Sequence, residues 1–143
     1  MLRNIPPILS PDLLWTLRAM GHGDDLVIAD ANFPATALGA RCHRLDGMTS
    51  TEVLQAVLTV LPLDKFVPNP ALVMETVDNP EAVPPIFVEF QDIMNATADN
   101  PVTLDKLERF DFYDRAKTAF AIIQTGETRL YGNIILKKGV IGA

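Results

Sequence analysis

The sequence has little cysteine, little positive charge and no long apolar run. Its 143 residues contain one cysteine, Cys42, which excludes an intramolecular disulfide and suits a reducing compartment. There are 12 Lys and Arg against 18 Asp and Glu, for a net charge of −6. An acidic surface has no attraction for the phosphates of nucleic acids or for anionic membranes. We therefore expect neither nucleic acid nor a membrane as a partner.

Signals for secretion or membrane insertion are also missing. Residues 1–7 contain no long apolar stretch and no cleavage-site pattern, unlike a signal peptide. The apolar run at residues 55–63 is too short to span a bilayer. With 48% apolar and 21% charged residues, the composition is typical of a folded globular protein. These features predict one cytoplasmic domain over residues 1–143.

Histidine is scarce, which restricts the metal and nucleophile chemistry on offer. The chain has two histidines, His22 and His43, and no His or Cys stands at metal-ligand spacing from His22. Aspartates at positions 24, 25 and 30 keep a divalent-metal hydrolase open as an alternative, but we predict no metal and no cofactor. Cys42 is open as a nucleophile, although a lone cysteine without further signals is more often incidental.

Apolar periodicity and capping residues define three main helices. Ser10 caps the first, at residues 11–20, and a capping box at Thr49 opens the second. Prolines at positions 84 and 85 open the third, because proline suits the first turn of a helix. Trp15 follows the apolar stripe of the first helix, and we expect it in the core.

Short apolar runs rich in β-branched residues predict strands between the helices. They fall at residues 26–29, 71–77, 104–110, 120–124 and 130–136, with a short helix at 112–118. The turn at 125–127 joins the last two strands, which we expect to pair as a hairpin. Residues 35–47 follow no clear pattern. The alternation predicts an α/β fold, a single three-layer domain with a mixed β-sheet and helices on both faces.

His22 is the strongest catalytic candidate. It lies between Gly21 and Gly23, where a predicted helix ends and a strand is about to begin. The small neighbours leave the imidazole uncrowded, and an imidazole can accept and donate protons near neutral pH. The same position also suits a surface histidine whose cation is stabilised by the C-terminal end of the helix dipole. Spacing alone leaves both interpretations open.

Further polar candidates stand beside predicted strands. Asp30 follows the first strand, and ligand crevices of α/β sheets lie at such strand ends. Arg109 offers a fork of donors, while Tyr131 and Asn133 offer donors and acceptors that suit sugar hydroxyls. The alternatives are an ion pair of Arg109 with a local carboxylate and a tyrosine that only fills an edge of the sheet.

Five motifs, in order along the chain, resemble the L-fucose mutarotase and D-ribose pyranase family. They lie at residues 9–14, 20–24, 30–34, 108–113 and 125–136. The fit is loosest at residues 35–47 and 77–100. In its fuller form the fourth motif includes Phe112-Tyr113 and Arg115-Ala116-Lys117. This form, together with Leu61-Pro62-Leu63-Asp64, resembles the fucose branch more than the ribose branch.

The resemblance implies a role for each candidate residue. His22 corresponds to the acid/base residue of the family, Asp30 and Arg109 to substrate-binding residues, and Tyr131-Gly132-Asn133 to a segment that lines the sugar pocket. Bacterial fucose members often carry a second histidine where this chain has Asn32, and asparagine cannot transfer protons at neutral pH. The resemblance therefore implies that His22 acts without a second histidine from that motif.

The implied function is that of an isomerase that interconverts the anomers of a free monosaccharide, with L-fucose as the expected sugar. Ring opening and closure require a proton to leave the anomeric hydroxyl and another to reach the ring oxygen, which needs no cofactor or metal. The resemblance also implies a homo-oligomeric ring, such as a decamer, with sugar sites at the subunit interfaces. A D-ribose pyranase and a non-catalytic sugar-binding or assembly protein on the same scaffold are the alternatives.

Overall fold

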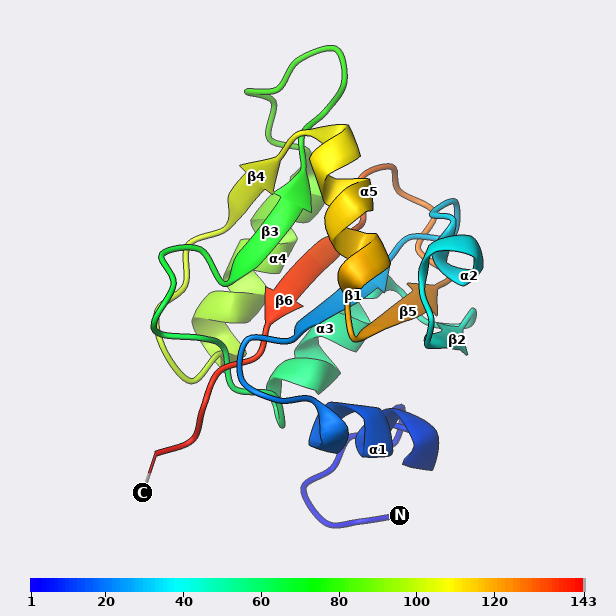
Figure 1. Ribbon diagram of the computed structural model, residues 1–143, viewed down its shortest axis with the longest axis vertical. Helices are drawn as coiled ribbons and strands as arrows, with labels where there is room; N and C mark the ends of the chain where they lie inside the picture. The colour runs from blue at the N-terminus through cyan, green and yellow to red at the C-terminus, as the bar shows by residue number, and fades with distance from the viewer. Residues whose placement is uncertain (143) are drawn as a thin grey trace.

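A six-stranded β-sheet forms the middle layer of the structure, a computed structural model that describes residues 1–142 (Figure 1). The strands are β1 (Asp25–Ala29), β2 (Cys42–Leu45), β3 (Ala71–Met74), β4 (Asp105–Leu107), β5 (Ala121–Thr125) and β6 (Ile134–Lys137). Their order across the sheet is β2-β5-β1-β6-β3-β4. β6 runs antiparallel to its neighbours β1 and β3, whereas the other neighbouring strands are parallel. The sheet is therefore mixed.

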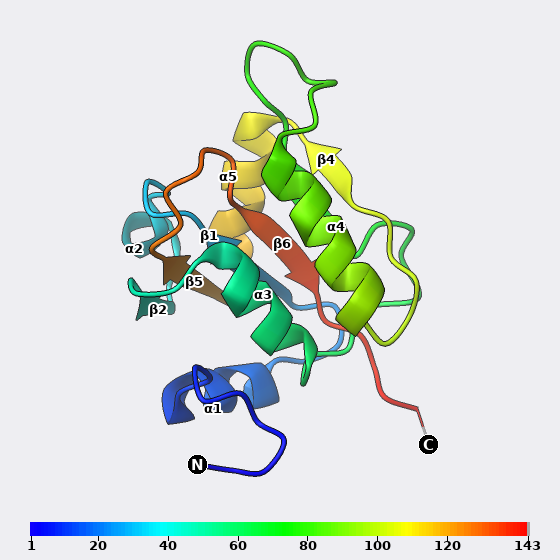
Figure 2. The same ribbon diagram turned by 180° about the vertical axis from the view of Figure 1, so that it is seen from behind.

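Helices cover both faces of this sheet. They are α1 (Pro11–Ala19), α2 (Ala35–Leu38), α3 (Ser50–Leu58), α4 (Pro85–Thr97) and α5 (Arg109–Thr118). Figure 1 shows α2 and α5 in front of the sheet. The view from behind shows α3 and α4 on the opposite face, with α1 next to the end of α3 (Figure 2). The predicted α/β architecture with helices on both faces is confirmed.

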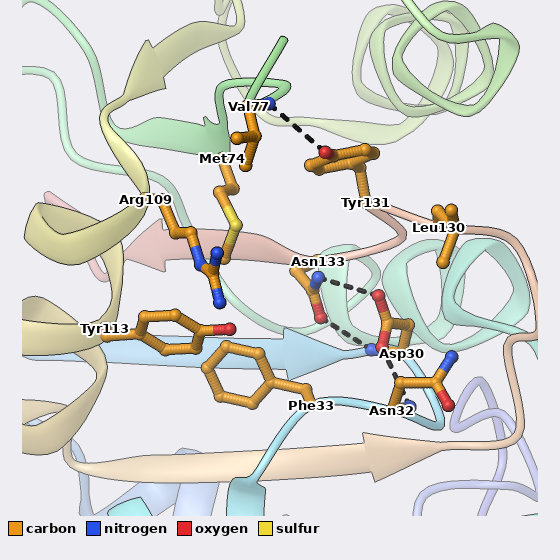
Figure 3. A pocket seen from close by; sticks show the side chains of 10 residues that line it. All are labelled: Asp30, Asn32, Phe33, Met74, Val77, Arg109, Tyr113, Leu130, Tyr131 and Asn133. Carbon is orange, nitrogen blue, oxygen red and sulfur yellow. Dashed lines mark hydrogen bonds between the residues drawn. The ribbon is translucent and has the colours of Figure 1, made fainter.

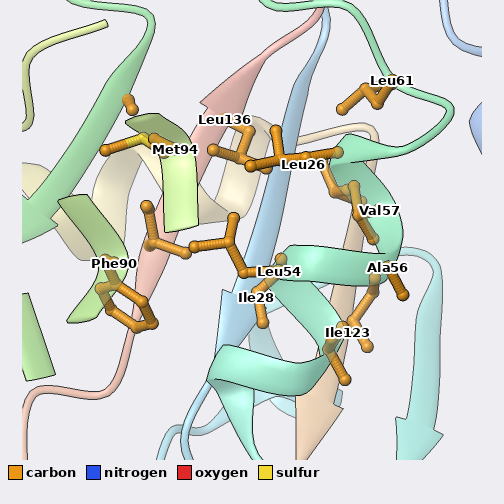
Figure 4. Close-up of a cluster of buried hydrophobic side chains, with 14 of the residues drawn as sticks. Leu26, Ile28, Leu54, Ala56, Val57, Leu61, Phe90, Met94, Ile123 and Leu136 are labelled. Atoms are coloured by element: carbon orange, nitrogen blue, oxygen red, sulfur yellow. The ribbon is translucent and has the colours of Figure 1, made fainter. Parts of the chain in front are cut away.

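The central strand β1 is buried on both faces. Leu26 and Ile28 belong to the apolar cluster beneath α3 and α4, with Leu54 and Phe90 (Figure 4). Val27, which points to the other face, packs in the cluster beneath α5. A strand covered on both faces is apolar at successive positions. This explains why the sequence of β1 shows a continuous apolar run and not an alternation.

Capping side chains begin the helices where the sequence indicates. Ser10 caps α1, and Thr49 with Glu52 forms both hydrogen bonds of the capping box of α3. Glu108 caps α5 by accepting hydrogen bonds from two backbone N–H groups of the first turn. Because α5 begins directly after Glu108, the strand predicted at residues 104–110 is limited to β4.

The predicted hairpin of the last two strands is wrong. β1 lies between β5 and β6, parallel to β5 and antiparallel to β6. Residues 126–133 carry the chain past the carboxyl end of β1, so the strand predicted at 130–136 begins only at Ile134. The apolar pattern signals that both strands are buried, but it does not signal which strand separates them.

The structure corrects one further expectation and assigns one segment that the sequence left without a prediction. The Trp15 side chain is 62% exposed and lies outside the core, because the buried face of α1 is formed by Leu13, Thr16 and Leu17. Residues 35–47, which follow no clear sequence pattern, contain the one-turn helix α2 and the edge strand β2. Each of these elements has four residues, which are too few to show the spacing of apolar residues that identifies a helix or a strand.

The core makes one prediction about stability. Leu54 is fully buried on α3, so the Leu54→Ala variant loses its apolar contacts and leaves a cavity. We expect the free energy of unfolding to fall by about 2–5 kcal/mol, measured by urea denaturation at one protein concentration. Leu2→Ala is the matched control, since Leu2 is 68% exposed and its truncation should change the free energy by less than about 0.5 kcal/mol. Equal effects of the two variants would contradict the assignment of this core.

Candidate active site

A small pocket of about 190 Å³ lies at the carboxyl ends of β1 and β3, beside the first turn of α5 (Figure 3). The carboxyl ends of parallel strands are where α/β sheets bind ligands. Ten residues line this pocket: Asp30, Asn32, Phe33, Met74, Val77, Arg109, Tyr113, Leu130, Tyr131 and Asn133. Four of the residues predicted from the sequence, Asp30, Arg109, Tyr131 and Asn133, are therefore brought together from distant parts of the chain.

Asp30 and Asn133 form the buried floor of the pocket. The Asn133 amide donates to Asp30 Oδ2 at 2.8 Å, and its Oδ1 accepts from the Asp30 backbone N–H at 2.7 Å. Asp30 Oδ1 accepts from the Asn32 backbone N–H at 2.9 Å. Burial raises the pKa of the Asp30 carboxyl above its usual value, while these hydrogen bonds from Asn32 and Asn133 act in the opposite direction. The Asp30 carboxyl lines the pocket as a hydrogen-bond acceptor.

Arg109 and Tyr113 form the opposite side of the pocket. Both lie on the first two turns of α5, and the Arg109 guanidinium stands 5.7 Å from the centre of the Tyr113 ring. Figure 3 shows the guanidinium above the Tyr113 ring, on the cavity side of α5. Among residues 1–142, no carboxylate lies within ion-pair distance of Arg109. The alternative of a local ion pair is therefore wrong for the described residues, and the donors of Arg109 face the cavity.

Tyr131 adopts an unusual backbone conformation at the edge of the pocket. Its φ is 63°, in the left-handed region that bulky residues rarely occupy. Its hydroxyl accepts a hydrogen bond from the Val77 backbone N–H at 3.2 Å. The next residue is Gly132, where an added Cβ would lie 2.6 Å from Glu127 Cγ. Gly132 therefore supports the pocket through close packing of the segment and does not line it.

His22 lies away from this pocket. It stands in the turn before β1, whereas Asp30 follows the last residue of that strand. The five residues of β1 alone span roughly 13–16 Å at about 3.3 Å per residue. The predicted site residues therefore divide into two groups at opposite ends of one strand, and His22 of one protomer cannot reach the pocket of the same protomer.

His22 has a carboxylate partner of its own. Its Nε2 is 3.2 Å from Asp64 Oδ1, and the Asp64 side chain is only 3% exposed while that of His22 is 46% exposed. The Asp64 carboxylate also accepts from the Phe66 backbone N–H at 3.0 Å. This hydrogen bond lowers the pKa of Asp64, with a smaller contribution from His22, although burial raises it. A buried carboxylate in contact with an exposed imidazole fixes the orientation of its ring.

Asp64, Phe66 and Tyr113 were not recognised as site residues from the sequence. Phe66 is 74% exposed, and its ring meets the His22 ring edge-on with 5.6 Å between the centroids. Asp64 stands 42 positions from His22, so local spacing holds no signal of the contact. Asp64 and Tyr113 do lie within stretches that resemble the mutarotase family, and this was the available signal.

The aspartates nearest His22 have other partners. Asp24 accepts from the Gly21 backbone N–H at 2.7 Å, and Asp25 pairs with Arg115 and Lys137 at 2.8 Å each. Within residues 1–142, no cluster of three His, Cys, Asp or Glu side chains is arranged as a metal site. In the same part of the chain, no helix is long and apolar enough to cross a membrane.

The segment that carries Tyr131 and Asn133 is held by a buried carboxylate. Glu127 accepts hydrogen bonds from the Arg129 guanidinium at 2.9 Å and from the Ser50 hydroxyl at 3.3 Å. These contacts, with Arg129 first, lower the pKa of Glu127 from 4.5 to about 2. A carboxyl with a lowered pKa stabilises the fold above its unfolded-state pKa and loses this effect as pH falls toward the folded value.

We therefore predict that Glu127→Gln lowers the free energy of unfolding at pH 7 by about 1–3 kcal/mol. The difference from the wild type should shrink as pH falls from about 4.5 to about 2, where the wild-type carboxyl becomes protonated. Urea denaturation at pH 7, 5 and 3 measures both effects. Asp114→Asn is the control, because Asp114 forms an exposed ion pair with Lys117 that should contribute less than about 1 kcal/mol. A pH-independent difference for Glu127→Gln would contradict the prediction.

Comparison with known proteins finds relatives that match nearly the whole chain. The model of the RbsD / FucU transport protein family matches residues 3–141. The fucose mutarotase of Homo sapiens is 47% identical, over 98% of this chain and 94% of the relative. The L-fucose mutarotase of Haemophilus influenzae is 43% identical, over 98% of this chain and 97% of the relative.

A solved structure agrees with these matches. The fucose mutarotase from Streptococcus pneumoniae, in complex with L-fucose, is similar with a TM-score of 0.91 and 42% identity. The similarity covers 99% of this chain and all of that one, at 100%. The likeness therefore extends over the sheet, both helical layers and the segments that line the pocket.

Proposed function

This chain belongs to the RbsD / FucU transport protein family, and we propose from this membership that it is a sugar mutarotase. It is an isomerase that interconverts the α and β anomers of a free monosaccharide, L-fucose. The observation that carries this function is the polar pocket of Asp30, Arg109 and Asn133, which has the chemistry to hold a polyol. We also propose a cytoplasmic location, which suits a chain with a single, unpaired cysteine.

The reaction requires two proton transfers on one sugar. The anomeric hydroxyl loses a proton while the ring oxygen gains one, the ring opens, the aldehyde rotates and the ring closes on its other face. An imidazole can carry out such transfers, because histidine titrates near neutral pH. We assign this role to His22, with Asp64 as the carboxylate that orients its ring. Asn32 occupies the position at which bacterial fucose members of the family often carry a second histidine. His22 therefore transfers protons without a second histidine from that motif.

The remaining residues hold the sugar. The Asp30 carboxylate accepts from sugar hydroxyls, and the Arg109 guanidinium donates to them. Asn133 keeps the Asp30 carboxylate in place through its amide. Holding the reacting atoms in a fixed orientation removes much of the entropic barrier to the reaction.

The separation of His22 from the pocket implies a shared active site. We infer that His22 of one protomer completes the pocket of a neighbouring protomer in a homo-oligomer. Surfaces at opposite ends of β1 make such a contact head-to-tail, and head-to-tail contacts that close generate rings. Exposed apolar residues occur at both ends: Phe66 beside His22 is 74% exposed, and Leu130 at the pocket is 68% exposed. Burial of such residues in a subunit contact supports the assembly.

We predict that His22→Ala lowers the rate of anomer exchange on L-fucose by about 10²–10⁴-fold, because the acid/base group is lost. Saturation-transfer NMR on the anomeric protons measures this rate. His43→Ala is the matched control, since His43 bonds the Thr16 hydroxyl at 2.8 Å on another part of the molecule. The proposed function would be refuted by full exchange in His22→Ala, and equally by a wild-type protein that binds the sugar without exchange above the spontaneous rate.

A second prediction tests the shared site. Neither His22→Ala nor Asp30→Asn protomers should be active alone, but co-expressed mixed assemblies contain sites with His22 from one protomer and Asp30 from its neighbour. Random mixing in equal amounts should restore about one quarter of the wild-type activity. In the control mixture, His22→Ala is combined with a His22→Ala/Asp30→Asn double variant, and no site can be restored. Failure of the first mixture to exceed this control would show that the site is not shared.

A further inference from the structure

We propose that Met74 and Val77 form an apolar wall that binds the substituent at C5 of the sugar and makes the pocket selective for 6-deoxy sugars. The inference rests on the proposed mutarotase function and deepens it. It assigns to these two residues a specificity role at a site whose polar residues account only for the hydroxyls.

The pocket is polar on one side and apolar on another. Asp30, Asn133 and Arg109 present oxygens and nitrogens to the cavity, as described above. Met74, the last residue of β3, is 5% exposed and points its thioether into the cavity on the side where Arg109 stands (Figure 3). Val77 continues this edge outward from Met74 and is 57% exposed. A ligand that contacts Asp30 and Asn133 on one side of the pocket therefore meets carbon and sulfur atoms of Met74 and Val77 on the other, next to the Arg109 guanidinium.

Leu130 also lines the pocket, but it lies on the far side of the Tyr131 ring from Met74 and Val77 and is not part of this wall (Figure 3). Its side chain is 68% exposed in the single protomer. The Tyr131 ring stands beside Val77 and contributes its carbon face to the wall.

Val77 is held in place and is not part of a loose flap. Its backbone N–H donates to the Tyr131 hydroxyl, so the strained backbone of Tyr131 is coupled to the position of the wall. The same loop is fixed further along, where Lys106 Nζ donates to the carbonyls of Pro80 and Ala82 at 2.7 and 2.8 Å. A fixed wall can discriminate between substituents, because it cannot move aside for a larger one.

The chemistry of the sugar matches this division. The pyranose ring of L-fucose carries hydroxyls at C1 to C4 and a single apolar substituent, the methyl group at C5. D-Arabinose has the same ring stereochemistry with hydrogen in place of the methyl, and L-galactose has a hydroxymethyl there. An apolar pocket that loses a methyl contact loses roughly 10-fold in kcat/KM. A hydroxyl placed against the wall without a partner reduces kcat/KM by roughly 10- to 100-fold.

The experiment compares anomer exchange on these three sugars by saturation-transfer NMR. For the wild type we expect kcat/KM to be highest on L-fucose, roughly 10-fold lower on D-arabinose and roughly 10- to 100-fold lower on L-galactose. Val77→Thr, which replaces a methyl by a hydroxyl of similar size, should lower the ratio of L-fucose to L-galactose by about 3-fold or more. Met74→Gln should shift the ratio in the same direction.

Val83→Thr is the matched control. Val83 is a valine of the same loop region, is 61% exposed and does not line this pocket, so its variant should keep the wild-type ratio. If Met74→Gln fails to fold because Met74 is buried, Val77→Thr decides the question, since its side chain is exposed. Wild-type rates that are equal on L-fucose and L-galactose, or a ratio in Val77→Thr equal to that of Val83→Thr, would overturn the wall. Absence of exchange on all three sugars would instead overturn the proposed function, and the wall with it.

Discussion

The reciprocal hydrogen bonds between Asp30 and Asn133 are the contact on which the pocket depends. They join the carboxyl end of β1 to the residue directly before β6. Both side chains are buried, so each must find its partners inside the protein, because an unpaired buried polar group is strongly destabilising. The pairing brings the segment with Tyr131 beside the end of the central strand. This contact exists only because β6 lies next to β1 in the sheet.

The segment between β5 and β6 transmits this constraint to the pocket wall. Glu127 holds this segment in place by accepting hydrogen bonds from Arg129 and Ser50. Gly132 can approach Glu127 closely because it has no side chain to block the contact. Tyr131 has a left-handed backbone conformation, and its hydroxyl accepts a hydrogen bond from the Val77 backbone N–H. Strain of this kind persists where the surrounding contacts over-determine the conformation, as is common at functional sites. Residues 127–133 thus combine an ion pair of a buried carboxylate, a tightly packed glycine and a tyrosine that lines the pocket.

Much of the fold could be predicted from local signals. The caps at Ser10 and Thr49 placed the helix starts, because capping depends on residues within one turn. The run of β1 identified a buried strand for the same local reason. The hairpin prediction failed because strand order depends on contacts distant in sequence. The exposure of Trp15 was missed because the apolar stripe of α1 does not show which of its residues the neighbouring elements cover.

By itself, the sequence determined the residue types available for chemistry, the α/β class and the resemblance that connects the motifs with a sugar mutarotase. These depend on composition, short-range periodicity and motif order, all of which can be read along the chain. Only the tertiary structure decided that Asp30, Arg109, Tyr131 and Asn133 meet in one pocket, while His22 stands with Asp64 at the other end of β1. The physical reason is that a strand has a fixed length per residue, so eight positions of sequence separate His22 from Asp30 by nearly the full height of the sheet.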